Sequence, residues 1–121
     1  MAQYQHLPIY KATYELLRLV TQATSNFPRA YKYSLGDKLR EEVVEMVVFV
    51  FKANSSRGAG RAAQAALFLE RLQVVELLMR LSKDLRLLSV KQFSEIVSMS
   101  DSLGRQAQGW IKSSASLAES K

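Results

Sequence analysis

The 121-residue sequence contains no cysteine, a single histidine, two prolines and five glycines. The lack of cysteine excludes disulfides, thiol catalysis and thiolate metal sites, and it fits a reducing cytoplasm best. The scarcity of proline and glycine leaves long stretches of Leu, Ala, Val, Glu, Lys and Arg without a helix breaker. Together with 48% apolar residues, these absences predict one all-α domain with its own core.

Long hydrophobic runs are also absent. The longest, residues 46–51, is far shorter than the roughly 20 residues that a membrane-spanning helix needs. The N-terminal residues show no basic start followed by an apolar run, so we expect no secretory signal. The sequence therefore predicts a soluble, cytoplasmic protein with no membrane partner.

Catalytic groups are scarce as well. The only histidine, His6, precedes the first predicted helix, where a lone histidine has no nucleophile to activate. Di-iron bundles need Glu-x-x-His pairs on two helices, and this sequence has none. The glycines around residues 57–61 have the spacing of neither the Walker nor the dinucleotide motif. We therefore expect no enzyme activity, no catalytic residue, no metal and no cofactor.

Apolar residues recur at helical spacings of three and four in four segments. Pro8 suits a first helical position, and Pro28 ends the first segment before a basic, aromatic loop. The pairs Ser34 with Asp37 and Ser89 with Gln92 resemble capping boxes. Because the connections are short, the pattern predicts an antiparallel up-down-up-down four-helix bundle spanning residues 1–121. The predicted helices cover about residues 8–25, 35–53, 61–88 and 90–112, with a frayed tail at 113–121.

Two of these helices carry more apolar surface than one core needs. On residues 35–53 the apolar positions cover about 200° of the helix, roughly twice the width of a core-facing stripe. We assign Leu39, Val43, Met46, Val47 and Val50 to the core there, and Leu67, Val74, Leu78, Leu81, Leu85 and Leu88 on the next helix. The second stripes then predict an oligomer interface. It consists of Val44, Val48, Phe51, Phe68, Leu72, Val75 and Met79. An irregular bundle with both stripes internal is the alternative.

The charge is strongly positive, with 17 Lys and Arg against 11 Asp and Glu and a net charge of +6. Such a balance favours polyanionic partners, RNA or DNA, although a merely basic domain would show it too. In the bundle, Lys52, Arg57 and Arg61 gather at one end, near Lys112 and with few acids around them. The other end holds Arg29, Lys32, Lys83, Arg86 and Lys91, diluted by Asp37, Asp84 and Glu95.

Two tyrosines, Tyr31 and Tyr33, lie in the basic loop before the second predicted helix. Exposed aromatic rings there could stack on unpaired bases. Packing of the loop onto the bundle explains the same residues equally well. The sequence leaves both interpretations open.

Five segments together resemble a known four-helix-bundle family. They are LPIYKATY at residues 7–14, YKYSLGDKL at 31–39, ANSS at 53–56, LMRLSKDL at 78–85 and GW at 109–110. The family includes the accessory variability determinant of diversity-generating retroelements and the proteins encoded in intervening sequences of bacterial large-subunit rRNA. The resemblance extends over about residues 7–112.

This resemblance implies a homopentameric, barrel-like assembly that binds the element's reverse transcriptase and its template RNA, and supports mutagenic cDNA synthesis without catalysing it. By matching segments it implies that Arg80, Lys83 and Arg86, with Lys52 and Arg57, contact a polyanion or the polymerase. A relative of the rRNA-intervening-sequence type, with a structural or RNA-associated role, is the first alternative. A monomeric adaptor that binds a peptide on its second apolar stripe is the other.

Overall fold

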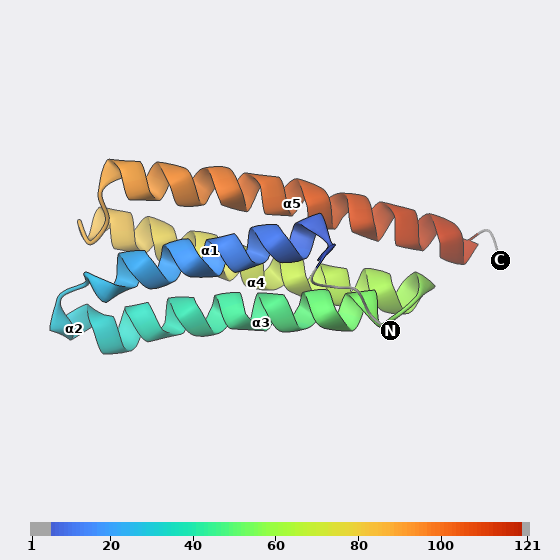
Figure 1. Ribbon diagram of the computed structural model, residues 1–121, viewed down its shortest axis with the longest axis horizontal. Helices are drawn as coiled ribbons and strands as arrows, with labels where there is room; N and C mark the ends of the chain where they lie inside the picture. The colour runs from blue at the N-terminus through green and yellow to red at the C-terminus, as the bar shows by residue number, and fades with distance from the viewer. Residues whose placement is uncertain (1–5, 120–121) are drawn as a thin grey trace.

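The computed structural model describes residues 6–119, and this range contains helices and no strand (Figure 1). The elements are α1 (Pro8–Ser25), α2 (Arg29–Tyr31), the π-helical segment η2 (Lys32–Gly36), α3 (Asp37–Asn54), α4 (Gly58–Asp84) and α5 (Val90–Glu119). The predicted all-α class is therefore confirmed. Among the described helices, none combines the length and the apolar character needed to cross a membrane.

Four long helices surround one core (Figure 1). Helix α1 packs against α3 and α5, and α4 packs against the same two helices from the other side. Figure 1 shows α2 and the α4–α5 turn at one end of the bundle, and the α3–α4 turn at the other. We call the first the α2 end (residues 27–36 and 80–91). We call the second the α3–α4 end (residues 52–61 with the facing part of α5, residues 105–112).

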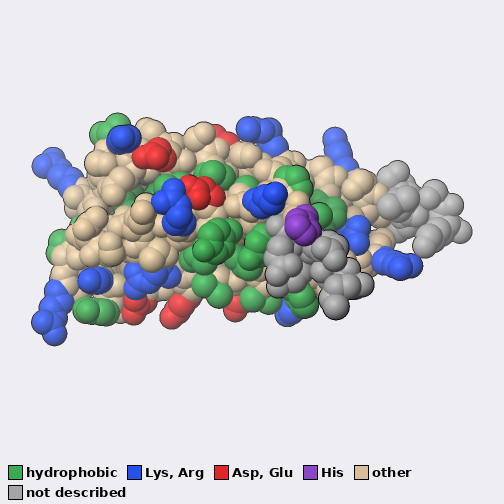
Figure 2. Space-filling model, in the orientation of Figure 1, with side chains coloured by type: hydrophobic (Ala, Val, Ile, Leu, Met, Phe, Trp, Pro, Cys, Tyr) green, Lys and Arg blue, Asp and Glu red, His purple; other side chains and the backbone are tan. Residues whose placement is uncertain are grey.

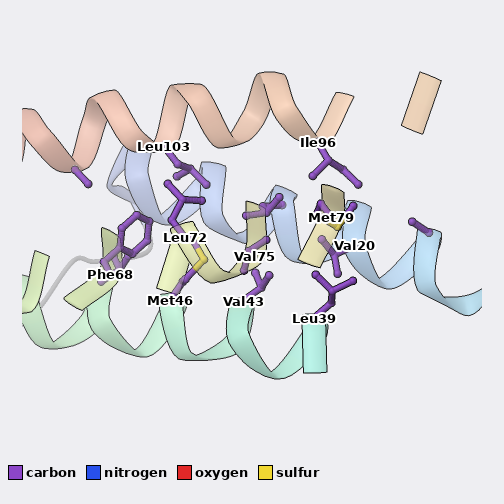
Figure 3. Close-up of a cluster of buried hydrophobic side chains, with 14 of the residues drawn as sticks. Val20, Leu39, Val43, Met46, Phe68, Leu72, Val75, Met79, Ile96 and Leu103 are labelled. Carbon is purple, nitrogen blue, oxygen red and sulfur yellow. The ribbon is translucent and has the colours of Figure 1, made fainter. Parts of the chain in front are cut away.

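The core is formed by one buried stripe from each long helix (Figure 3). Its fully buried side chains include Leu16, Val20, Leu39, Val43, Met46, Val50, Phe68, Val75, Met79 and Leu103. The core positions predicted on α3 are correct for Leu39, Val43, Met46 and Val50, and Val47 is half-buried. These residues keep one face of α3 toward α1 and α4, which leaves Val44, Val48 and Phe51 exposed.

On α4 the stripe predicted to form a subunit interface faces the core instead. Phe68, Leu72, Val75 and Met79, predicted at a subunit interface, are at most 3% exposed and lie inside the chain's own core (Figure 3). From the stripe assigned to the core, Leu88 is buried as predicted and Val74 and Leu78 are half-buried. Leu67, Leu81 and Leu85 are exposed instead. The two stripes are offset by one residue, about 100° around the helix, and both are apolar. Hydrophobicity alone therefore could not decide which stripe faces inward.

The connection between α1 and α3 is helical, whereas the sequence predicted a loop at residues 29–33. Pro28, with φ of −55° and ψ of 151°, takes the N-cap position, so helical backbone begins at Arg29. It continues without a break through η2 into α3. The predicted capping box at Ser34 is wrong, because its hydroxyl donates to the Ala30 carbonyl at 3.2 Å.

The turn between α4 and α5 begins at Leu85, so α4 ends earlier than predicted. Arg86 has a positive φ of 63°, the left-handed conformation that usually marks a helix C-terminus as glycine. The Leu87 N–H donates to the Ser82 carbonyl, and the Arg86 N–H donates to the Lys83 carbonyl, both at 2.9 Å. This pair of bonds is the Schellman motif. The sequence missed it because arginine stands in the glycine position.

The capping box predicted at the start of α5 is confirmed. The Ser89 hydroxyl accepts a hydrogen bond from the Gln92 N–H, and the Gln92 side chain accepts one from the Ser89 N–H, both at 3.0 Å. At its other end α5 continues to Glu119, past the predicted limit at 112, because residues 113–119 contain no glycine or proline. Residues 120–121 of the predicted tail lie outside the described range.

Candidate nucleic-acid interface

Arg61 ties three helices together at the α3–α4 end. Its Nε donates to the Ala53 carbonyl at 2.9 Å, and its guanidinium also bonds the Asn54 carbonyl at 3.3 Å. Both carbonyls belong to the last turn of α3, where a cation is favoured by the helix dipole. The same guanidinium lies over the Trp110 ring of α5, 5.7 Å from its centroid. The charge of Arg61 therefore stabilises the contact between these helices, in addition to contributing to the basic surface.

The α3–α4 end contains several cations and almost no carboxylates. No acidic residue occurs in the sequence between Glu45 and Glu70, a stretch that includes Lys52, Arg57 and Arg61. Lys52 and Arg57 are exposed. Figure 2 shows Lys and Arg, and no Asp or Glu, over the visible part of the molecule at this end. The geometry thus brings together three of the predicted binding residues without local neutralisation.

Helix α5 extends this basic surface through Lys112, which the sequence placed near this end, and through Arg105, which it did not. Arg105 and Lys112 are exposed on α5, and no acid separates them, since the next one after Asp101 is Glu119. Both residues line an open groove between α4 and α5, next to Gly104 and Gly109. The absence of acids between Asp101 and Glu119 is visible in the sequence, and it would have identified Arg105 as an unneutralised cation.

The α2 end is basic but mixed. Arg80, Lys83 and Arg86 are exposed near the end of α4, and the Lys83 Nζ lies 5.1 Å from the centroid of the Phe93 ring. Arg29 is exposed and Lys32 is half-buried on the other side of this end. The predicted acids lie among them, since Asp84 and Glu95 are also exposed. The eight predicted binding residues therefore separate into two surfaces at opposite ends of the bundle.

Exposed apolar side chains form two stripes on the outside of the bundle. On α3 they are Val44, Val48 and Phe51, exposed by 48%, 36% and 45%. On α4 they are Leu77, Leu81 and Leu85, spaced by four residues and exposed by 66%, 44% and 41%. Only three of the seven predicted interface residues thus remain available to a second copy. Leu77 was missed, although its spacing places it on the same stripe as Leu81.

One buried carboxylate joins α3 to α4 away from both ends. Glu42 is 4% exposed, and its two carboxylate oxygens lie 3.0 Å from Lys38 Nζ and from Arg71 Nη1. On the surface of α1, a hydrogen bond from Arg18 lowers the pKa of Glu15.

No group of three or more His, Cys, Asp or Glu residues able to hold a metal ion occurs in the described part of the chain.

These features define a basic four-helix-bundle protein whose cations concentrate at the ends of the bundle. The model of the bAvd-like family matches residues 7–114, nearly the whole described chain. The protein therefore belongs to the bAvd-like family, and the resemblance expected from the sequence is confirmed. Among curated proteins, none matches this chain.

Proposed function

We propose that this protein is a non-enzymatic accessory of a diversity-generating retroelement, which binds nucleic acid and the element's reverse transcriptase in the cytoplasm. In this role it supports mutagenic cDNA synthesis primed on the template RNA. Membership of the bAvd-like family supports the proposal. The observation that carries it is the acid-free α3–α4 end, where Lys52 and Arg57 are exposed.

Each end of the bundle receives its own partner in this proposal. The α3–α4 end suits a phosphate backbone, because unneutralised Lys and Arg release counterions from a polyanion without reading its sequence. At the α2 end, Arg80 and Lys83 lie beside the exposed Leu77 and Leu81. A surface that mixes apolar and basic side chains suits a protein, and we assign it to the reverse transcriptase.

Homopentamer formation is part of the proposal. The exposed stripe of Val44, Val48 and Phe51 supports it, because contiguous apolar surface is costly to leave in water. Five copies of a +6 chain carry +30, and a field of that size attracts a polyanion more strongly than one bundle does. The double substitution of Val44 and Val48 by Glu should lower the mass in light scattering to that of a monomer, with helical circular dichroism retained.

Charge reversals at the two ends test the function. The variants K52E/R57E and R80E/K83E each change the net charge from +6 to +2, so that only the location of the change differs. We expect K52E/R57E to weaken binding of a structured RNA about tenfold or more, and the other pair to reduce co-purification of the reverse transcriptase instead. Wild-type affinity should fall steeply as salt rises.

Two results would contradict this proposal. If the wild-type protein bound no RNA even at low salt, the nucleic-acid role would be lost. If RNA binding were strong but the reverse transcriptase never co-purified, the rRNA-intervening-sequence type of function would replace the retroelement role.

A further inference from the structure

Tyr33 is an exposed aromatic ring that the packing of the α2 end does not use. Its side chain is 65% exposed, although it lies in the middle of a segment that is well anchored. Two neighbouring residues do the packing: Phe27 is 4% exposed, and Leu35 packs against the core. The packing interpretation that the sequence left open therefore does not apply to Tyr33, because its ring does not hold the segment to the bundle.

The backbone that carries Tyr33 packs closely against α1. Residue Gly36 is buried, and a Cβ there would lie 3.4 Å from the Thr24 Cβ. Next to it, Arg40 Nη1 donates a hydrogen bond to the Thr24 hydroxyl at 2.6 Å. Tyr33 itself lies in the π-helical segment η2, and such segments are frequent at functional sites. The ring is therefore carried by packed helical backbone and not by an open loop, which lowers the entropic cost of binding.

Two cations accompany the ring. The Lys32 Nζ lies 5.9 Å from the centroid of the Tyr33 ring, and Arg29 is exposed four residues before Tyr33, about one helical turn away. The nearest acid along the chain, Asp37, forms an ion pair with Arg40. In the described residues, neither Arg29 nor Lys32 has an ion pair of its own.

We propose that this site, formed by Arg29, Lys32 and Tyr33, binds an unpaired nucleotide of a single-stranded nucleic acid. The base stacks on the Tyr33 ring, and the two cations contact the flanking phosphates. The inference rests on the proposed function and adds to it a second nucleic-acid contact, which is specific for unpaired nucleotides and lies on the side of the α2 end opposite Arg80 and Lys83. Paired bases in a duplex are stacked inside the helix, so they cannot reach Tyr33.

Tyrosine variants test the site with an oligo(U) strand of about 15 nucleotides and a fully paired, blunt-ended RNA duplex. We expect Tyr33→Ala to weaken oligo(U) binding about tenfold and to leave duplex binding unchanged. Tyr33→Phe should bind both like the wild type, because the phenyl ring keeps the stacking face. Tyr14→Ala is the matched control, since Tyr14 is 56% exposed on α1 and stacks on Tyr10. It should change neither affinity.

A phosphate contact by Lys32 can be tested separately, through the salt dependence of oligo(U) binding. The variant Lys32→Gln should reduce the slope of log affinity against log salt for oligo(U) by about 0.7, the value for one contact to a single strand. An unchanged slope would remove Lys32 from the site.

Several outcomes would overturn the site. If Tyr33→Ala bound oligo(U) as tightly as the wild type does, the site would be overturned, while duplex binding, and with it the proposed function, would remain intact. If Tyr33→Ala lost affinity for both RNAs equally and the melting temperature of the protein fell, Tyr33 would have a structural role. A changed molecular mass would show a subunit contact. Failure of the wild-type protein to bind either RNA would instead remove the proposed function itself.

Discussion

The Arg61 guanidinium lies over the ring of Trp110, 5.7 Å from its centroid, and caps the C-terminus of α3 at the same time. Trp110 is the only tryptophan in the sequence. When tryptophan is excited selectively, a change in its emission therefore reports on the α3–α4 end alone.

Trp110 emission should respond to RNA. We expect a salt-sensitive quenching on addition of a structured RNA, because phosphates drawn to Lys52 and Arg57 bring bases near the ring and compete for Arg61. The K52E/R57E variant should lose this signal. The measurement is a fluorescence titration run beside an anisotropy titration with labelled RNA. Tight binding by anisotropy with no change in Trp110 emission would place the RNA at another surface.

Removal of Arg61 should destabilise the fold. The variant Arg61→Ala loses two hydrogen bonds to α3 carbonyls and the contact with Trp110, and we expect a loss of about 1–2 kcal/mol. Lys52→Ala removes one equal charge from the same end, and its effect should stay within about 0.5 kcal/mol. Urea denaturation of both variants measures the difference. Equal effects would show that Arg61 has no capping role.

Glu42 should matter for the α3–α4 contact. The variant Glu42→Gln keeps the size of the side chain but removes the charge between Lys38 and Arg71. We expect a loss of about 1–2 kcal/mol in urea denaturation, since charge-assisted hydrogen bonds at a buried site are lost and Arg71 can still reach water. Glu41→Gln, one residue away and exposed, is the control and should be nearly neutral. Equal stability of Glu42→Gln and the wild type would contradict this interpretation.

The regular parts of the fold could be predicted because their signals are local. The period of Leu39, Val43, Met46 and Val50 identifies the buried face of α3, and the Ser89 and Gln92 pair identifies the start of α5. Each signal lies within a few turns of one helix. No knowledge of neighbouring helices is needed to read it.

The orientation of α4 could not be predicted, because it depends on its neighbours. Its two stripes are both apolar, and Phe68 faces inward only because α3 and α5 leave space for its ring there. The candidate site was predictable only in part. The lack of acids around Lys52 can be read from the sequence. The capping role of Arg61 and its contact with Trp110 depend on how α3, α4 and α5 meet, which only the tertiary fold determines.

Replacing Arg86 with glycine tests whether its left-handed backbone conformation lowers the stability of the protein. Its φ of 63° in the Schellman motif is a conformation in which a Cβ is unfavourable, so Arg86→Gly should stabilise the protein by about 0.5–1 kcal/mol. The same substitution at Arg80, an exposed position inside α4, should instead destabilise it by about 1 kcal/mol. Thermal and urea denaturation measure both changes. A less stable Arg86→Gly variant would mean that the arginine side chain makes a contact whose loss outweighs the relief of backbone strain.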